Sequence, residues 1–503
     1  MESNWIANTI NKGKYSELIE DLSKVEVCIV GAGIFGLSVG YYLAKNGINV
    51  VILEKEKEIG MKTSGLTTGK ITSQHGLIYK YLIESYGYEY AKNYLQSNEN
   101  AIGEIFKIIN EEKIECDFKI QDSYLYTSEE QKVNDIKEEI KAVNSLKIIN
   151  AEFQKNLEIP LNTFGAIKFS NQAQFHPRKY MIGLANAIIK YGGKIYTNST
   201  VEDIKIAENG YNILTNNKVI NSNKVVLATR YPILNFPGFY FTKMYQEVSY
   251  AMAIDTKCEL FEGMYRDVDS SKYSFRCATD NGKKILLIGG LSHKTGEERN
   301  LSYIYNILET KAKEYYPLCK ILYKWNTEDC ITLDKIPYIG EYSNLMKDLY
   351  IATGFKKWGM TMSNVAANII YSKIKGEESE VQKVYNSTRI NPIKNYMEVK
   401  NMISEAVNGI IVKKFKVKNG EISDIANDTG KIIKIDGENI GVYKDPIGKI
   451  YAVKPYCTHL GCLLTWNELN KSWDCPCHGS RFDFYGKNID DPAIKSLEKY
   501  DIE

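Results

Sequence analysis

The sequence has almost no excess charge, because 64 Lys and Arg residues face 62 Asp and Glu residues and leave a formal net charge of +2. Such a chain has no general attraction for nucleic acid or for an anionic membrane, so neither is expected as a partner. Long apolar segments are scarce as well. The uncharged run 27–44 contains four glycines, which favours a strand, a turn and a helix over a membrane span. The first residues lack the features of a secretory signal, and we expect a cytoplasmic protein.

Cysteine is too sparse for a disulfide scaffold, with ten in 503 residues, and histidine is sparser, with five. Six of the cysteines stand alone along the chain and are expected to be reduced packing residues. The other four lie near the C-terminus, where two of the five histidines also fall. This cluster consists of Cys457, His459, Cys462, Cys475, Cys477 and His478. Metal chemistry is therefore expected in this segment.

The order of sequence patterns predicts three regions. An apolar strand, a glycine turn, a helix and a second strand occupy 25–56, which predicts a βαβ unit. From 79 to 390, charged helical patterns such as 129–144 alternate with strand-like runs such as 224–228, which predicts an α+β region. Short strands separated by Gly, Asp and Asn turns begin near Gly409 and predict a small all-β module.

The βαβ unit carries Gly31, Gly33 and Gly36 as a GxGxxG sequence at the end of its first strand. The first glycine permits the tight turn, the second lets the backbone approach a pyrophosphate, and the third lets the helix pack on the strand. Glu54 ends the second strand 18 residues after Gly36, near the position expected for an acid that binds an adenosine ribose. The unit predicts a dinucleotide site, which either NAD or FAD could occupy. No second GxGxxG follows a strand, which argues against an additional NADH domain.

Three segments outside the βαβ unit bear on the choice between NAD and FAD. The loop 60–75 is rich in glycine and hydroxyl groups that could donate hydrogen bonds to a second phosphate and to a flavin ring. The segments 336–340 and 349–370 lead a strand through a glycine turn into a helix whose first N–H groups could face an isoalloxazine. Together with the glycine turn, these segments resemble the D-amino-acid-oxidase-like family of FAD-dependent oxidoreductases, which includes glycine and sarcosine oxidases. The resemblance spans residues 1–385.

This resemblance implies α/β plus α+β architecture, with a Rossmann-type FAD domain and an interleaved antiparallel-sheet substrate domain over much of 81–165 and 236–325. It also implies that a strand at Val201 touches the adenine and that 225–230 returns beneath the flavin. The residues that it implies for FAD binding are Gly31, Gly33, Gly36, Glu54, Ser64, Thr67, Thr68, Lys70, Val201, Gly354, Trp358, Gly359, Met360 and Thr361.

No catalytic residue is assigned. The lone histidines His75, His176 and His293 are expected to be structural, although His75 could anchor a flavin covalently. Lys70 could approach the flavin or a phosphate. Arg266 and Arg276 lie in the implied substrate sheet and could clamp a carboxylate, but ion-pair or surface roles are favoured.

The clustered cysteines and histidines near the C-terminus fall in two short motifs, here called boxes: CTHLGC, which starts at Cys457, and CPCHGS, which starts at Cys475. Two thiolates and two imidazoles could bind zinc. Each box also holds a further cysteine and a glycine, and the arrangement resembles the Rieske [2Fe-2S] family, in which one iron takes two cysteines and the other two histidines. The resemblance implies Cys457 and Cys475 as ligands of the inner iron, with His459 and His478 on the outer, more exposed iron.

The same resemblance implies a disulfide between Cys462 and Cys477 and a hydroxyl donor at Ser480. Phe482 stands where high-potential members carry a tyrosine, so we expect a cluster below the top of the Rieske range of potentials. A Rieske oxygenase would need a separate mononuclear iron site. The remaining histidines are too widely spaced for one, so an oxygenase is not expected.

We therefore predict an FAD-dependent oxidoreductase domain over 1–390, a polar helical linker over 391–408 and a Rieske domain over 409–503. The expected function is oxidation of an amine or amino acid by hydride transfer to FAD, with electrons passing singly through the cluster to an external carrier at the exposed histidine edge. A dehydrogenase is favoured over an oxidase. Two alternatives remain: a reductase with electrons flowing from the cluster to FAD, and a redox sensor or electron-transfer protein without its own substrate.

Overall fold

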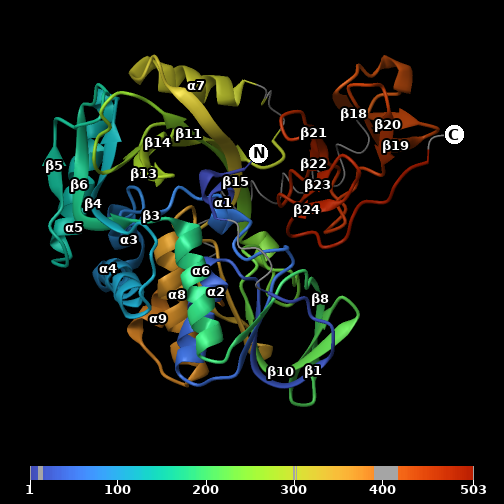
Figure 1. Cartoon of the computed structure of the whole chain (residues 1–503), viewed down its shortest axis with the longest axis horizontal. Coiled ribbons are helices and arrows are strands. Elements are labelled where there is room, and N and C mark those ends of the chain that lie inside the picture. The colour runs from blue at the N-terminus through green and yellow to red at the C-terminus, as the bar shows by residue number, and fades with distance from the viewer. Residues whose placement is uncertain (1, 10–14, 298–300, 302, 390–416, 502–503) are drawn as a thin grey trace.

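The structure is a computed structural model that describes residues 2–9, 15–297, 301, 303–389 and 417–501. Two sheets with their helices make up the larger N-terminal part, and a small β module, red in Figure 1, lies beside both sheets. The predicted linker 391–408 lies outside the described residues.

The first sheet is built on the predicted βαβ unit. Its parallel core follows the order β17 (Met346–Thr353), β10 (Lys218–Leu227), β1 (Leu22–Val30), β2 (Val50–Leu53) and β7 (Lys194–Tyr196). Antiparallel neighbours complete it: β16 (Tyr338–Ser343), β9 (Gly210–Thr215) and β8 (Val201–Ala207). The central strands read as apolar runs because both of their faces are covered, and every residue of β2 is buried.

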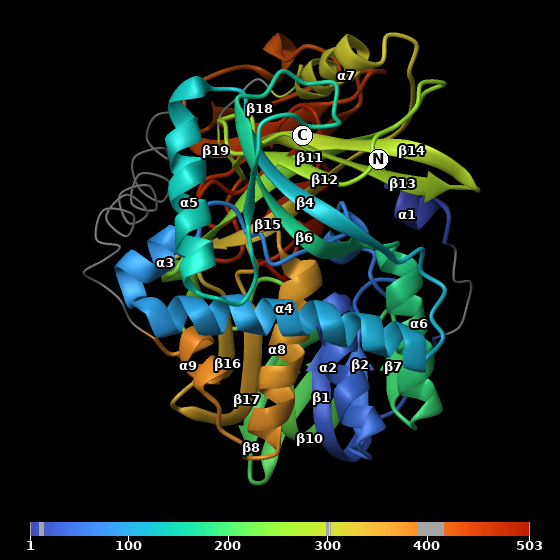
Figure 2. The same cartoon turned by 90° about the vertical axis from the view of Figure 1, so that its left-hand side faces the viewer.

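Helices cover one face of this sheet. α2 (Ile34–Lys45) packs between α6 (Pro177–Lys190) and α8 (Gly359–Ile374), and α4 (Tyr88–Glu111) crosses them (Figure 2). The shorter helices are α1 (Asn4–Ala7), α3 (Tyr79–Tyr86) and α9 (Glu380–Tyr385). No helix within the described ranges is both long enough and apolar enough to cross a bilayer.

The second sheet is interleaved with the first along the chain, as predicted. Its order is β15 (Lys320–Thr332), β11 (Met244–Asp255), β14 (Lys283–Lys294), β13 (Ser274–Asp280), β12 (Met264–Asp267), β4 (Lys119–Thr127), β6 (Gly165–Gln174) and β3 (Lys70–Ile71), with β5 (Glu152–Gln154) on β6. All pairs are antiparallel except β12 with β4. Two helices lie on it, α5 (Val133–Ser145) and α7 (Ile304–Tyr315).

The C-terminal module is all β in its described part, as the turn-rich sequence predicts. One sheet joins β18 (Thr429–Ile435), β19 (Glu438–Lys444) and β20 (Ile450–Val453). The other joins β21 (Thr465–Asn467), β22 (Ser472–Asp474), β23 (Arg481–Asp483) and β24 (Asn488–Asp490). Its core contains Trp473 and Phe482 together with the four clustered cysteines. The loops that carry these cysteines are therefore anchored in a packed interior.

Candidate functional site

The glycine turn has the geometry that its sequence predicts. Gly31 adopts a φ of +109°, and a Cβ there would lie 2.6 Å from the Ala228 carbonyl oxygen. A Cβ on Gly36 would lie 1.9 Å from the Gly31 carbonyl oxygen, so only glycine lets α2 pack this closely on the turn. Gly33 caps α2, and the next N–H donates to Ser64 Oγ at 3.1 Å.

Glu54 lies at the end of β2 beside this turn and is 8% exposed. Its Oε2 accepts the Ala32 N–H at 2.8 Å, and its Oε1 accepts the Glu56 N–H at 3.0 Å. Burial raises the pKa of this carboxyl although both backbone donors oppose the shift. The two bonds fix the carboxylate at the mouth of the turn and leave it further lone pairs for a ligand.

Two adjoining cavities open around the turn. The glycine-turn cavity is lined by Gly31, Glu54 and Val201, among others, and the sheet cavity extends from Ser64 to β11, β15 and Trp358. The two share Gly33, Ser64 and Arg230, so they form a continuous depression across the carboxyl ends of the parallel strands.

Most of the residues that the resemblance implied for FAD line these cavities. The glycine-turn cavity includes Gly31, Gly33, Glu54, Ser64 and Val201. The sheet cavity includes Thr67, Thr68, Lys70, Gly354, Trp358, Gly359 and Met360. Gly36 lies behind the turn in its packing role. Thr361 differs from the expectation, because its hydroxyl turns away from the wall and donates to the Thr72 carbonyl at 3.0 Å.

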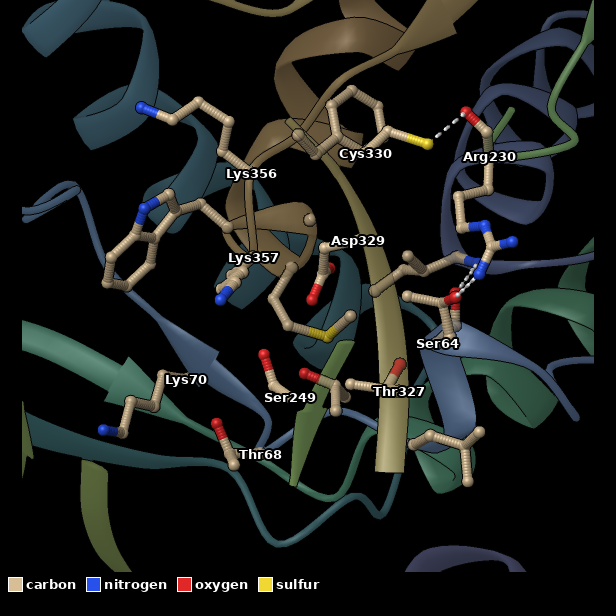
Figure 3. Close-up of a pocket in the computed structure, with 18 of the residues that line it drawn as sticks. Ser64, Thr68, Lys70, Arg230, Ser249, Thr327, Asp329, Cys330, Lys356 and Lys357 are labelled. Atoms are coloured by element: carbon tan, nitrogen blue, oxygen red, sulfur yellow. Dashed lines mark hydrogen bonds between the residues drawn. The ribbon is translucent and has the colours of Figure 1, made fainter. Parts of the chain in front are cut away.

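Cationic side chains gather on one side of the sheet cavity (Figure 3). Burial lowers the pKa of Lys70 well below its ordinary value, and Lys70 Nζ donates to the Tyr265 carbonyl at 2.7 Å. Burial, with the charges of Lys335 and Arg266, lowers the pKa of Lys356 to about 7. The wall therefore favours an anionic group in this cavity.

Arg266 is the cation with the fewest partners on this wall. Its guanidinium lies over the Trp358 ring at 4.9 Å and forms no hydrogen bond or ion pair within the part of the chain that the structure describes. Arg276 differs, because it donates to the Gly69 and Phe175 carbonyls and supports the loop from behind. The sequence favoured ion-pair or surface roles over a carboxylate clamp for both arginines, and of the two only Arg266 lines the sheet cavity.

The lone histidines, which were expected to be structural, lie outside the lining of both cavities. His75 lies behind Trp358, and its two ring nitrogens meet Tyr94 Oη and the Thr72 carbonyl, each at 2.8 Å. His176 caps α6 by accepting the Lys179 N–H, and His293 contacts Tyr250 Oη.

The clustered cysteines and histidines come together at the tips of two loops in the C-terminal module. Cys462 and Cys477 form a disulfide, as predicted. Their sulfurs and that of Cys475 lie within 4.8 Å of one another, and the Cys475 thiol interacts with that of Cys457. A hydrogen bond from Cys475 lowers the pKa of Cys457 to about 7. Two sulfurs are committed to the disulfide, so Cys457 and Cys475 remain as ligands.

His459 and His478 complete the ligand set. Their rings lie 5.0 Å apart, and both Nδ1 atoms are buried with no hydrogen-bond partner among the residues that the structure describes. Burial lowers the pKa of His459 to about 4 and that of His478 to about 3, which keeps both imidazoles neutral as metal binding requires. Two thiols and two unpartnered imidazole nitrogens fit a mixed Cys2His2 centre.

The histidine edge is not the free surface that the sequence suggested. His478 is 5% exposed, and its carbonyl accepts Gln246 Nε2 at 2.8 Å from the N-terminal part. His459 Nε2 lies 2.5 Å from Asn235 Oδ1, and the Phe241 ring lies beside both imidazoles. Glycines make this approach possible, because a Cβ on Gly479 would lie 2.7 Å from Gln246 Cβ. The edge therefore faces the N-terminal part.

Buried charges join the module to the cavities. Arg230 Nη2 lies 3.4 Å from Glu328 Oε2, and Arg481 Nε lies 3.6 Å from Glu328 Oε1. Asp490 approaches Arg481 at 3.4 Å and Arg230 at 4.0 Å. Burial and the Asp490 charge raise the pKa of Glu328 to about 8, although both arginines oppose the shift. We call Arg230, Glu328, Arg481 and Asp490 the interdomain charge network.

Module residues also line the glycine-turn cavity. Asn488, Asp490, Asp491 and Ile494 belong to its lining. Asp491 pairs with Lys55 at 3.0 Å, one residue beyond Glu54. Nothing in the sequence indicated these contacts, because acidic residues in a C-terminal turn carry no sign of a partner more than 400 positions away. Arg230 is the member of this network that the sequence placed near the flavin, because it ends the segment 225–230 that the resemblance put beneath it.

A glycine-turn nucleotide fold that faces a Cys2His2 centre defines a two-centre redox protein. Comparisons with known proteins identify both parts. The family model described as FAD dependent oxidoreductase (DAO) matches residues 26–372, and the model described as Rieske [2Fe-2S] domain matches residues 415–501. The chain belongs to the DAO family of FAD-dependent oxidoreductases and carries a C-terminal Rieske domain.

Relatives agree with this assignment. A Bacillus subtilis (strain 168) protein named as the Rieske 2Fe-2S iron-sulfur protein YhfW is 36% identical over 502 residues, covering 100% of this chain and 98% of the relative. Gamma-glutamylputrescine oxidoreductase of Escherichia coli (strain K12) is 25% identical, covering 75% of this chain and 89% of its own. The crystal structure of glycine oxidase from Geobacillus kaustophilus superposes with a TM-score of 0.62 at 18% identity, covering 73% of this chain and 99% of that one.

The cofactors of this chain are FAD and a [2Fe-2S] cluster. The donor set supports the second, because the two unpartnered imidazole nitrogens and two thiols supply the ligands that a Rieske cluster takes. The zinc interpretation of the two boxes is set aside in favour of the Rieske domain.

Proposed function

We propose that the chain is a dehydrogenase that oxidises an amine or amino acid and delivers the electrons, one at a time, to an external carrier. When bound, FAD accepts a hydride and the cluster takes up single electrons. The cavity residues given above are proposed to hold FAD, with Cys457, Cys475, His459 and His478 holding the cluster. The proposed domains are 1–390 and 409–503, joined by 391–408.

The orientation of the module carries this proposal. Its histidine edge lies against the segment that includes Asn235, Phe241 and Gln246, and Arg230 lies five residues before Asn235 on the wall shared by both cavities. Electron exchange within one chain needs the two centres to face each other. A module that only docked foreign partners would have no reason to bury its histidines against its own oxidoreductase domain.

The substrate class rests on the charge of the sheet cavity. Lys70, Lys356 and the unpaired Arg266 provide positive charge for a carboxylate, and the planar guanidinium can bind one through two parallel hydrogen bonds. The low pKa of Lys356, about 7, lets its amine hold or release a proton beside a bound ammonium near neutral pH. The E. coli relative, named for gamma-glutamylputrescine, supports an amine.

Anaerobic mixing with candidate amino acids and amines tests the proposal. The expected result is loss of the oxidised flavin absorbance followed by the paramagnetic signal of the reduced cluster, with little peroxide when air is readmitted. Cys475→Ser is the control, since it removes a proposed cluster ligand that lines neither cavity and should leave the flavin step intact.

The alternatives give different results in the same experiment. Reduction of the flavin only after an external carrier has reduced the cluster would support the reverse flow. Failure of every amine and amino acid to bleach the flavin, while the cluster still cycles with carriers, would support a sensor. Stoichiometric peroxide in both proteins would support an oxidase.

A further inference from the structure

Tyr231 is a buried tyrosine between the two cofactor sites. It directly follows Arg230, which lines both cavities, and it is 1% exposed. Its ring lies 6.4 Å from the His459 ring at an angle of 80°. Its hydroxyl is buried and finds no hydrogen-bond partner within the described part of the chain.

An unpaired buried hydroxyl is destabilising, so such groups normally have a hydrogen-bond partner. The neighbours of this hydroxyl narrow the choice of partner. The Tyr231 ring lies beside His459, and the thiols of Cys330, Cys475 and Cys457 lie within electrostatic range of its hydroxyl. Two of these three thiols, Cys475 and Cys457, are the proposed ligands of the inner iron.

The position of Tyr231 is fixed by the wall of the oxidoreductase domain. Thr229 Oγ1 donates to the Tyr231 carbonyl at 2.7 Å, and the Arg230 carbonyl accepts Thr353 Oγ1 and Cys330 Sγ. These bonds set the backbone on both sides of the ring. The tyrosine is therefore presented to the module as part of a preformed surface.

We propose that the Tyr231 hydroxyl donates a hydrogen bond to the [2Fe-2S] cluster or its thiolate ligands from across the domain interface. Within the module, position 482 offers no hydroxyl, because Phe482 is buried in the core with a hydrocarbon ring. A donor stabilises the more negative reduced cluster and raises its potential. Because Tyr231 belongs to the oxidoreductase domain, the midpoint potential of the cluster would depend on whether the module is docked on that domain. The proposal rests on the Rieske assignment and on no particular substrate.

Tyr231→Phe tests this by removing one oxygen and keeping the ring. Redox titration followed by electron paramagnetic resonance should show a lower midpoint potential, with an equilibrium constant for cluster reduction about tenfold smaller, or about 59 mV for one electron. Tyr240→Phe is the matched control. Tyr240 is equally buried in the same core, but its hydroxyl donates to the Tyr342 carbonyl at 3.0 Å. Equal potentials for Tyr231→Phe and the wild type would overturn the proposal.

A second measurement tests the proposal even if Tyr231→Phe does not retain its cluster. In the wild-type protein, pulsed electron paramagnetic resonance in H2O and D2O should reveal an exchangeable proton coupled to the reduced cluster, in addition to the protons of backbone N–H groups. Gly296→Ala pushes the loop that carries Cys475 away from the oxidoreductase domain, so the coupling of that proton should weaken and the midpoint potential of the cluster should fall while Tyr231 stays in place. A coupling and a potential unchanged by displacement would refute the proposal. Chemical titrants reduce the cluster, so failure of the dehydrogenase proposal would leave these results unaffected.

Discussion

Gly296→Ala should open the contact between the module and the oxidoreductase domain. Gly296 adopts a φ of +75°, and a Cβ there would lie 2.5 Å from the Pro476 nitrogen and 2.6 Å from the Cys475 carbonyl carbon. Both atoms belong to the backbone of a cluster loop, which no side-chain rotation can move. Contact begins near 3.4 Å, so the loop would have to withdraw by about 0.9 Å.

The size of the effect follows from a matched glycine. Gly282 has a φ of +79° and nothing within 4 Å of the Cβ position, so Gly282→Ala carries the same backbone strain without the collision. Overpacking costs about 1–3 kcal/mol beyond that strain. The equilibrium constant for opening the interface should therefore rise about 5- to 150-fold in Gly296→Ala relative to Gly282→Ala.

Limited proteolysis at low protease concentration measures this constant, because cleavage then follows the population of the open form. The Gly296→Ala protein should be cleaved faster than the Gly282→Ala protein by that factor. Flavin-to-cluster electron exchange, started by photoreduction of the flavin, should slow in the first variant only. Equal cleavage rates for the two variants would refute the claim that the module can dock closely only because residue 296 has no Cβ.

Three further outcomes are expected. Glu54→Ala should raise the Kd for FAD by about 10- to 150-fold, measured by flavin fluorescence, because it removes a charged acceptor worth about 1.5–3 kcal/mol; unchanged affinity would exclude the ribose role. The pKa of Glu328 is raised to about 8, so the native state holds a proton that the unfolded state releases above about pH 4.5. The free energy of unfolding should therefore fall as the pH rises from 4.5 to 8, by up to about 1.4 kcal/mol per pH unit. In thermal melts, Glu328→Gln should remove this dependence of the free energy of unfolding on pH. Arg266→Gln should raise KM for a carboxylate substrate about 10- to 150-fold and leave an amine without a carboxylate unaffected, and equal changes for both would exclude the clamp.

Local patterns were enough to predict both cofactor sites in outline. The glycine turn, Glu54 and the two Cys/His boxes depend on short-range spacing, and short-range spacing is what a sequence displays directly. The disulfide between Cys462 and Cys477, which the resemblance to the Rieske family implied, is confirmed. Thr361 shows the limit of this reasoning, because Met360 and Ser363 line the sheet cavity while the Thr361 hydroxyl between them donates to the Thr72 carbonyl, and the sequence does not fix that rotation of the helix.

The relation between the two domains could not be predicted. Whether His478 is exposed depends on Gln246, and part of the charge of Asp490 is balanced by Arg230; both contacts join the two domains. Each of these residues reads as an ordinary polar surface position when taken alone. The electrostatic cost of burying them becomes apparent only when the partners meet.

Asp490 and Asp491 line the glycine-turn cavity together with Glu54 and Val201, so the oxidoreductase domain and the module share the wall of this site. A ligand held there would touch both domains at once. Its binding should strengthen the attachment of the module, and a loosened module should in turn release that ligand faster.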